Sequence, residues 1–127
     1  MHPFPHRYAV SAMAAPASVV TLRSAELEDI QSSAPPEFGG PAGNWSPETL
    51  FVAAIADCYI LSFRAVANAS KLEWSEIDCD AVGVLEKTAQ GLWFTVIELA
   101  VTLRIPAGSD IARAERLLEK AEQVCLV

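Results

Sequence analysis

The chain has 127 residues, of which 52% are hydrophobic and 20% charged, and its formal net charge is −7. This length predicts one domain over residues 1–127, and the composition excludes an intrinsically disordered chain. The negative charge argues against nucleic acid and anionic membranes as partners, because both need a positive surface. No uninterrupted apolar run reaches the ~18 residues that span a bilayer, and the N-terminus lacks the basic start and apolar core of a signal peptide.

The first part of the chain predicts short strands followed by a loop. Residues 7–11 and 18–24 are rich in β-prone side chains and predict an opening hairpin. Leu27 and Ile30 belong to a third segment, for which we expect an edge strand. Residues 32–44 contain three prolines and three glycines and therefore predict an irregular loop.

A long helix is predicted to begin at Ser46. Ser46 is a favoured N-cap, Pro47 fits the first helical position, and Glu48 complements the positive end of the helix dipole. From Leu50 to Ala67 the residues are nearly all apolar, which predicts a helix that is buried on most sides. In so small a chain, such burial needs a sheet on one face and a partner chain on the other.

The last part of the chain predicts two strands and a second helix. Apolar residues alternate around residues 77–81 and again over 97–105, with the turn near Gly91. Residues 106–110 end the second strand and cap a helix whose apolar face continues to Cys125. The order β-β-β-α-β-β-α predicts an α+β fold. Because no helix stop signal follows Cys125, we expect the sequence to be truncated or incomplete at this end.

Three cysteines carry the chemistry that the residue pattern suggests. Cys58, Cys79 and Cys125 lack the CxxC spacing of zinc sites and of secreted disulfide frameworks, so a reducing cytoplasm is the expected location. Cys79 occupies an inward strand position, where core packing is expected. Cys58 and Cys125 lie on two helices with core-facing apolar residues, and this arrangement suggests thiol redox chemistry in a sheltered pocket.

Two interpretations of Cys58 remain open. It shares a predicted helix face with apolar residues at spacings of three, four and seven, namely Phe51, Ala54, Ile55, Leu61 and Ala65. On one interpretation it is an inert core cysteine, since burial raises the pKa of a thiol. On the other it is a reactive thiolate, which needs a nearby cation, and the candidates are Arg7, Arg23 and Arg64.

Glu48 precedes Cys58 by ten residues, or roughly 15 Å along a straight helix. The two side chains therefore cannot meet within one chain. If Glu48 serves the thiol, it acts through an intervening cation or from a second chain, as two antiparallel helices at a two-fold axis would allow.

Other site classes are not supported by the sequence. His2 and His6 lie in a Pro-rich start and do not form a metal site, and no cofactor is predicted. The glycines near residue 40 lack the Lys-Ser/Thr of a phosphate loop. A cysteine hydrolase is disfavoured because no histidine beyond position 6 can act as its base.

Residues 35–67, PPEFGGPAGNWSPETLFVAAIADCYILSFRAVA, resemble the OsmC/Ohr family, the osmotically inducible and organic hydroperoxide resistance proteins. The resemblance rests on Gly39-Gly40, on the helix start Ser46-Pro47-Glu48, and on Cys58 ten residues after the glutamate. Cys125 matches the second cysteine of the family. The resemblance implies an intertwined α+β homodimer with active sites at the subunit interface.

For active members, the resemblance implies the reduction of small organic hydroperoxides. Cys58 would be the peroxidatic thiolate and would become a sulfenic acid, and Cys125 would resolve it as a disulfide. A dithiol or a lipoylated protein would then reduce the disulfide. Glu48 would hold an arginine over Cys58. The apolar residues around Cys58 would form the substrate pocket, with Phe51, Ile55 and Leu61 as its expected lining.

The sequence departs from the family pattern at two positions, and these departures define a second hypothesis. The family arginine lies in the N-terminal hairpin, but residues 11–18 contain none, and Arg7 and Arg23 only flank them. Leu126 follows Cys125, where active members carry proline. The alternative is a non-catalytic OsmC-like dimer that binds apolar ligands or senses thiol state.

Overall fold

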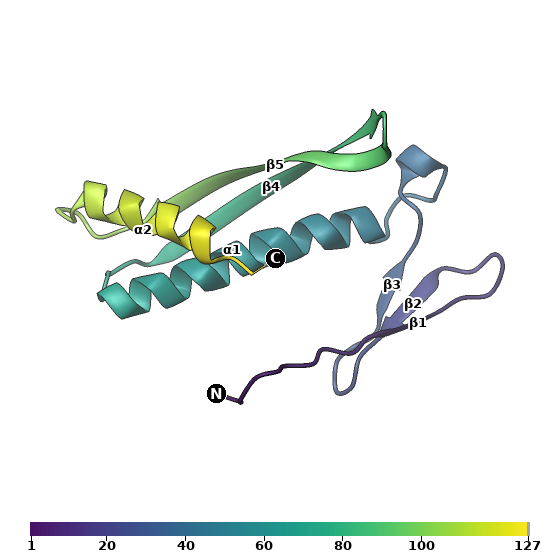
Figure 1. Ribbon diagram of the computed structural model, residues 1–127, viewed down its shortest axis with the longest axis horizontal. Helices are drawn as coiled ribbons and strands as arrows, with labels where there is room; N and C mark the ends of the chain where they lie inside the picture. The colour runs from purple at the N-terminus through teal and green to yellow at the C-terminus, as the bar shows by residue number, and fades with distance from the viewer. Residues whose placement is uncertain (127) are drawn as a thin grey trace. The chain divides into compact units, whose positions relative to one another are not determined.

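The computed structural model describes residues 1–126, which divide between Leu50 and Phe51 into two compact units. The order of the main elements is β1-β2-β3-α1-β4-β5-α2, and it confirms the predicted α+β class (Figure 1). One element is additional to the predicted ones, a short 3₁₀ helix over Pro36–Phe38 in the loop. That the chain is a single domain stays a prediction.

The first unit contains a three-stranded antiparallel sheet with β2 in the centre. Its strands are β1 (Ser11–Met13), β2 (Val20–Arg23) and β3 (Ile30–Ser32). The hairpin of β1 and β2 and the third strand were expected, but the placement of the first strand at residues 7–11 was wrong. Pairing starts beside the turn at residues 15–18, and Met13 pairs with Thr21. The strand therefore occupies the residues nearest that turn.

The Pro/Gly loop is held by backbone contacts. The N–H of Ser33 donates to the carbonyl of Trp45 at 2.9 Å, and the N–H of Gly40 donates to the carbonyl of Pro35 at 3.1 Å. A Cβ on Gly40 would lie 1.8 Å from the carbonyl oxygen of Ala34. Only glycine fits at this close approach, and Gly39 has a φ of 83°, which also favours glycine, so both glycines of the pair have a structural cause.

Ser46 caps α1 (Pro47–Ser70) as predicted. The Thr49 N–H donates to the Ser46 hydroxyl oxygen at 3.1 Å, and the Ser46 N–H donates to the Thr49 hydroxyl oxygen at 2.9 Å. These two bonds satisfy backbone donors at the helix start in the manner of a capping box. The cap thus sets the residue at which the loop becomes the helix.

The second unit packs α1 and α2 (Ile111–Val124) against one long hairpin (Figure 1). Its strands, β4 (Glu76–Thr88) and β5 (Gly91–Arg104), pair antiparallel with an irregularity after Val84 that leaves Thr95 without an opposite residue. The predicted alternation and turn are confirmed. The core contains Tyr59, Phe63 and Ala67 of α1 and Ala121 of α2, packed on the inward side chains of the hairpin.

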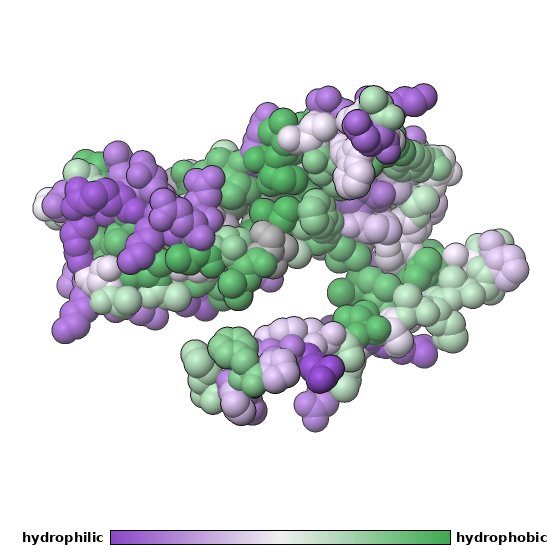
Figure 2. Space-filling model, viewed as in Figure 1, coloured by the Kyte–Doolittle hydropathy of each residue, from purple (hydrophilic) through white to green (hydrophobic). Residues whose placement is uncertain are grey.

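In this single chain α1 is buried on one face, as predicted, and the burial of its other face by a partner chain stays a prediction. Only Tyr59, Phe63, Val66 and Ala67 are buried, and the opposite side of the helix is open. Figure 2 shows hydrophobic residues at the surface of this unit, and hydrophilic side chains gather over α2. The hairpin and α2 cover one side of α1, so the apolar residues on its other side have no cover within the second unit.

The same helix also corrects the expectation about apolar runs. Pro47–Ala69 is long and apolar enough to cross a membrane by length and composition, although only 22% of its most apolar stretch is buried. Counting uninterrupted runs missed it, because Asp57, Ser62 and Arg64 divide the segment. A core helix of a soluble protein has the same composition, and Phe63 of α1 is fully buried in the protein core.

Candidate active site

Cys58 lies in the middle of α1 and is half-buried. Its sulfur is 3.9 Å from the hydroxyl oxygen of Ser62, one turn further along the helix. It also accepts a hydrogen bond from the backbone N–H of Leu126 at 3.4 Å. A hydrogen-bond donor at a thiol sulfur favours its negatively charged form.

Cys125 precedes Leu126, so the end of α2 brings the second cysteine to the neighbourhood of Cys58. The helix is shorter than predicted, because Cys125 is its C-cap residue with an extended backbone (φ −64°, ψ 131°). Asp110 caps the other end as expected, since its carboxylate accepts the N–H of Arg113 at 3.1 Å. Two cysteines that are 67 positions apart in the sequence therefore meet in one region of the second unit.

The face of α1 that carries Cys58 is not the face that forms the core. Ala54, Leu61 and Ala65, which were predicted to share a core-facing side with Cys58, are exposed, and Leu61 has 51% of its surface accessible. The core face passes instead through Tyr59 and Phe63. Since α1 is apolar all round, its periodicity could not distinguish these two sides.

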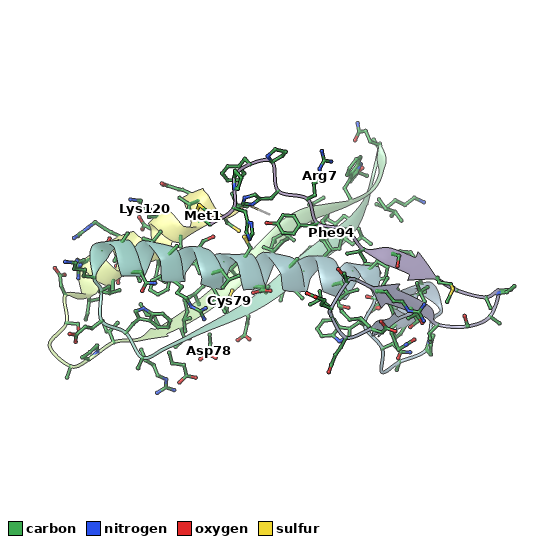
Figure 3. The ribbon with its side chains drawn as sticks, turned by 90° about the horizontal axis from the view of Figure 1, so that it is seen from below. Met1, Arg7, Asp78, Cys79, Phe94 and Lys120 are labelled. Carbon is green, nitrogen blue, oxygen red and sulfur yellow. The ribbon has the colours of Figure 1, made fainter. Side chains whose placement is uncertain are left out.

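The residues expected to line a substrate pocket are separated. The Phe51 ring packs on Phe94 of β5 with centroids 5.0 Å apart, and it remains 43% exposed. Phe94 on β5 and Cys79 on β4 are labelled in Figure 3. Ile55 lines a pocket, whereas Phe51 and Leu61 are not among that pocket's lining residues.

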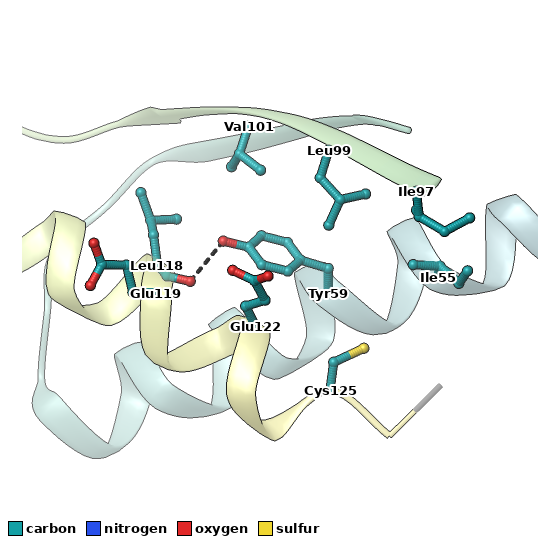
Figure 4. Close-up of a pocket in the computed structure, with 9 residues that line it drawn as sticks. All are labelled: Ile55, Tyr59, Ile97, Leu99, Val101, Leu118, Glu119, Glu122 and Cys125. Atoms are coloured by element: carbon teal, nitrogen blue, oxygen red, sulfur yellow. Dashed lines mark hydrogen bonds between the residues drawn. The ribbon is translucent and has the colours of Figure 1, made fainter. Parts of the chain in front are cut away.

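A pocket of about 470 Å³ lies among α1, β5 and α2 (Figure 4). Its wall is mostly apolar, with Cys125 at one end and two carboxylates on α2. The nine lining residues are Ile55, Tyr59, Ile97, Leu99, Val101, Leu118, Glu119, Glu122 and Cys125. The Tyr59 hydroxyl crosses between the helices and donates to the carbonyl of Leu118 at 2.9 Å. This bond ties the Cys58 helix to the helix that ends at Cys125.

The sequence-based prediction did not single out Tyr59. Burial raises the pKa of its phenol above the ordinary value of 10.0, and Cys79 and then Glu122 raise it further. The pKa of the Cys79 thiol is raised as well, first by burial and then by Asp80. Cys79 packs against the core cluster, as its inward strand position suggested. The sequence feature that could have identified Tyr59 as a site residue is its position directly after Cys58, with a second aromatic residue, Phe63, one helical turn further on.

The charged residues expected to serve Cys58 belong mostly to the first unit. Glu48 is in the first turn of α1, and among the described residues its buried Oε1 has no hydrogen-bond partner. Arg23 pairs with Asp29, its Nε lying 3.2 Å from Oδ2, and Arg7 is exposed in the N-terminal segment (Figure 3). Arg64 is an exposed residue of α1. An orphaned carboxylate oxygen such as that of Glu48 calls for a donor supplied from elsewhere.

No metal centre is found over residues 1–126, where no three His, Cys, Asp or Glu side chains gather in a position to hold an ion. The described cysteines, carboxylates and histidines therefore do not come together in threes around a common point.

The fold and the site define an α+β protein in which a capped Pro/Gly loop leads into the helix that carries Cys58, with the segment of Cys125 beside it. The family model for OsmC-like proteins matches residues 40–127, and the chain belongs to this family. An organic hydroperoxide resistance protein of Xanthomonas axonopodis pv. citri is 37% identical over 100 residues, which cover 76% of this chain and 67% of that protein. The predicted family is confirmed.

Solved structures share the fold. An OsmC-like protein of unknown function from Vibrio cholerae superposes with a TM-score of 0.84 at 21% identity, covering 96% of this chain and 91% of that one. An organic hydroperoxide resistance protein OsmC from Legionella pneumophila has a TM-score of 0.80 at 25% identity, covering 98% and 88%. The order of helices and strands described above is therefore that of the OsmC fold.

Proposed function

We propose that this protein is a thiol-dependent peroxidase that reduces small organic hydroperoxides in the oxidative stress response. The observation that carries the proposal is the contact between the Cys58 sulfur and the backbone of Leu126, at 3.4 Å, which brings the Cys125 segment to Cys58. The relatives named as organic hydroperoxide resistance proteins in Xanthomonas and Legionella support the choice of substrate class.

In the first half of the proposed reaction, the Cys58 thiolate attacks the terminal oxygen of the hydroperoxide. An S–O bond forms while the O–O bond breaks, and the leaving alkoxide takes a proton to become the alcohol. Cys58 is oxidised to a sulfenic acid, and the peroxide is reduced. The Leu126 N–H is the described donor that would stabilise charge on the sulfur during this step.

In the second half, the Cys125 sulfur attacks the sulfur of the Cys58 sulfenic acid. An S–S bond forms, and hydroxide leaves with the thiol proton as water. A dithiol or lipoylated partner then restores both thiols by two successive exchanges and is itself oxidised to a disulfide. Cys125 is the C-cap residue of α2 with an extended backbone, so closing this bond would not require a residue inside the helix to leave its helical hydrogen bonds.

The proposed assembly is a homodimer in the cytoplasm. The exposed apolar side of α1, including Leu61 at 51% accessible surface, supports a second copy as its cover. A second copy would also offer a donor to the orphaned Oε1 of Glu48, which one straight helix keeps far from its own Cys58. In this proposal Glu48 positions a cation for the thiolate and Arg7 is the candidate, since Arg23 already pairs with Asp29.

A non-catalytic OsmC-like dimer remains the second candidate, and the ion pair of Arg23 favours it. With Arg23 held by Asp29, one of the two arginines that flank the hairpin is occupied by a local carboxylate. A thiol without a cation nearby reacts slowly. Such a protein would use the pocket for binding alone.

The deciding experiment is oxidation of the reduced protein by equimolar cumene hydroperoxide, followed by mass spectrometry of the peptides. We expect a Cys58–Cys125 disulfide within seconds, with stoichiometric release of the alcohol. Cys58→Ser should abolish alcohol release, and Cys125→Ser should retain one turnover and leave a sulfenic acid at Cys58.

Cys79→Ser is the matched control, because Cys79 lies in the core cluster and takes no part in the proposed steps. It should form the same disulfide at the same rate. If the thiols of the unmodified protein survive for minutes with excess peroxide, the peroxidase is refuted and the binding protein stands.

A further inference from the structure

Tyr59 follows Cys58 directly on α1, and its ring is buried in the core with 5% of its surface accessible. Its hydroxyl reaches α2 and donates to the carbonyl of Leu118 at 2.9 Å (Figure 4). Phenylalanine would fill the same core position without a hydroxyl to desolvate, and a buried hydroxyl costs free energy unless it is hydrogen-bonded. Packing alone therefore does not require tyrosine here.

The hydrogen bond from Tyr59 is not needed to satisfy its acceptor. The carbonyl of Leu118 lies inside α2, where the backbone N–H of Glu122, four residues on, is its donor by helix geometry. What the bond adds is a fixed distance between one point on α1 and one point on α2. The point on α1 is next to Cys58, and the point on α2 lies seven residues, or about 10 Å along the helix, before Cys125.

α2 is also joined to α1 near its other end, where the guanidinium of Arg113 donates to the carbonyl of Ser70. Arg113 precedes Cys125 by twelve residues, or about 18 Å along the helix. A bond at this distance restrains Cys125 weakly, because a tilt of about 5° around it moves the end of the helix by about 1.5 Å. The bond of Tyr59 lies closer to Cys125 and limits this tilt.

The position of Cys125 matters because a disulfide has a strict geometry. The Cα atoms of a bridged pair lie about 4.4–6.8 Å apart. The N–H of Leu126, the residue after Cys125, donates to the Cys58 sulfur at 3.4 Å, so the Cys125 segment lies beside the sulfur that it would attack. A displacement of about 1 Å can slow a reaction between positioned groups by about a hundredfold. The tilt that the Tyr59 bond limits is of this size.

We propose that Tyr59 is a positioning residue, whose bond to Leu118 holds α2 so that the Cys125 sulfur reaches the Cys58 sulfur. The inference rests on the proposed peroxidase for the origin of the Cys58 sulfenic acid, and it deepens that proposal by naming the residue that aligns the two sulfurs. In the step that Tyr59 serves, the S–S bond forms, the S–O bond breaks, and hydroxide leaves with the thiol proton as water. The Cys125 sulfur is oxidised and the sulfenic sulfur is reduced.

The expected effect of removing the hydroxyl is moderate. α2 keeps the apolar contacts of Leu117, Leu118 and Ala121 with the core, so it stays packed on α1. The aligned arrangement loses one neutral hydrogen bond relative to tilted arrangements, which lowers the ratio of aligned to tilted molecules by about fivefold. Because tilted molecules do not close the disulfide, we expect closure to slow by about two- to fivefold.

The test lets dimedone compete with Cys125 for the sulfenic acid. Reduced protein is treated with equimolar cumene hydroperoxide in excess dimedone, and mass spectrometry of the peptides gives the ratio of Cys58–Cys125 disulfide to dimedone adduct at Cys58. This ratio starts from the sulfenic acid, so it does not depend on how fast the acid forms. Tyr59→Phe should lower the ratio by about two- to fivefold.

A second measurement needs no peroxide. The reduced proteins are equilibrated with buffers of reduced and oxidised glutathione, and the fraction that holds the Cys58–Cys125 disulfide gives the effective concentration of one thiol at the other. Tyr59→Phe should lower this effective concentration by about two- to fivefold, because the disulfide forms from the same aligned arrangement.

Arg113→Gln is the matched control, because it also removes a side-chain bond between the two helices, but at the end of α2 that is remote from Cys125. It should leave both measured values unchanged, although it lowers stability by a similar amount. A merely structural role of Tyr59 would instead give the same result in both variants.

Unchanged values in Tyr59→Phe, or an equal decrease in Arg113→Gln, would overturn the inference. Failure of the unmodified protein to form the Cys58–Cys125 disulfide in oxidised glutathione would overturn it as well. If the glutathione measurement gives the expected decrease while cumene hydroperoxide is not consumed, only the peroxidase is refuted.

Discussion

Tyr59→Phe tests whether the hydrogen bond between α1 and α2 stabilises the folded protein. The substitution removes the hydroxyl that donates to the carbonyl of Leu118 at 2.9 Å and keeps the buried ring. As a helical carbonyl, that of Leu118 also accepts the N–H four residues on, so it is not left entirely unpaired. The loss is therefore that of one neutral hydrogen bond, about 1 kcal/mol in the free energy of unfolding.

This magnitude corresponds to about a fivefold change in the unfolding equilibrium. For a domain of this size it lowers the urea midpoint by roughly 0.7 M, if the denaturant slope is about 1.5 kcal/mol per molar. The measurement is urea unfolding followed by circular dichroism. Both proteins must be compared at one concentration, since association would change the apparent stability.

The pH dependence gives an independent check. The pKa of Tyr59 is raised above 10.0 in the folded protein, mainly by burial, so above pH 10 the folded state keeps a proton that the unfolded chain has lost. The stability that Tyr59 contributes is therefore complete below pH 10 and is lost as the pH rises through the raised pKa. Phe cannot titrate, so the difference between the two proteins should shrink above pH 10. Equal midpoints at pH 8, or a constant difference up to high pH, would refute the reasoning.

Three further substitutions test the elements that position the site. Ser46→Ala removes the N-cap of α1 and should cost about 1 kcal/mol, measured by thermal unfolding, with no change in the fold. Gly83→Ala would put a Cβ 2.7 Å from Cγ2 of Val52, so we expect a loss of about 1–3 kcal/mol in urea unfolding. Arg113→Gln removes the guanidinium that donates to the carbonyl of Ser70 at the end of α1 and should cost about 1 kcal/mol, with amide exchange increased in the last turn. If one of these variants is as stable as the unmodified protein, the contribution to stability that we assign to the corresponding contact is wrong.

Local signals predicted much of the fold. The caps at Ser46 and Asp110 follow from short-range chemistry that is visible in the sequence, and both form as expected. The alternation of the hairpin likewise identified its inward residues, Cys79 among them. The irregularity after Val84 could not be predicted, because it depends on the pairing of two strands rather than on either one.

The site was harder to predict for a physical reason. In α1 the apolar residues surround the helix, so no periodic signal separates the side of Tyr59 from the side of Cys58. The approach of Cys58 to the backbone at Leu126 depends on how α2 packs, which no local pattern records. The two glutamates of the pocket look like ordinary solvent-facing residues until β5 supplies the opposite wall.

The order of elements along the chain has a consequence for biosynthesis. Phe63 on α1 depends on the β4–β5 hairpin and on α2 for its burial, yet α2 starts about forty residues after α1 ends. At ribosomal rates of about 5–20 residues per second, the finished helix spends roughly 2–8 s without the cover of α2. During that interval the nascent chain presents a segment long and apolar enough to resemble a membrane span. Glu48, Asp57 and Arg64 are the charges within the helix that oppose its insertion into a membrane during that interval.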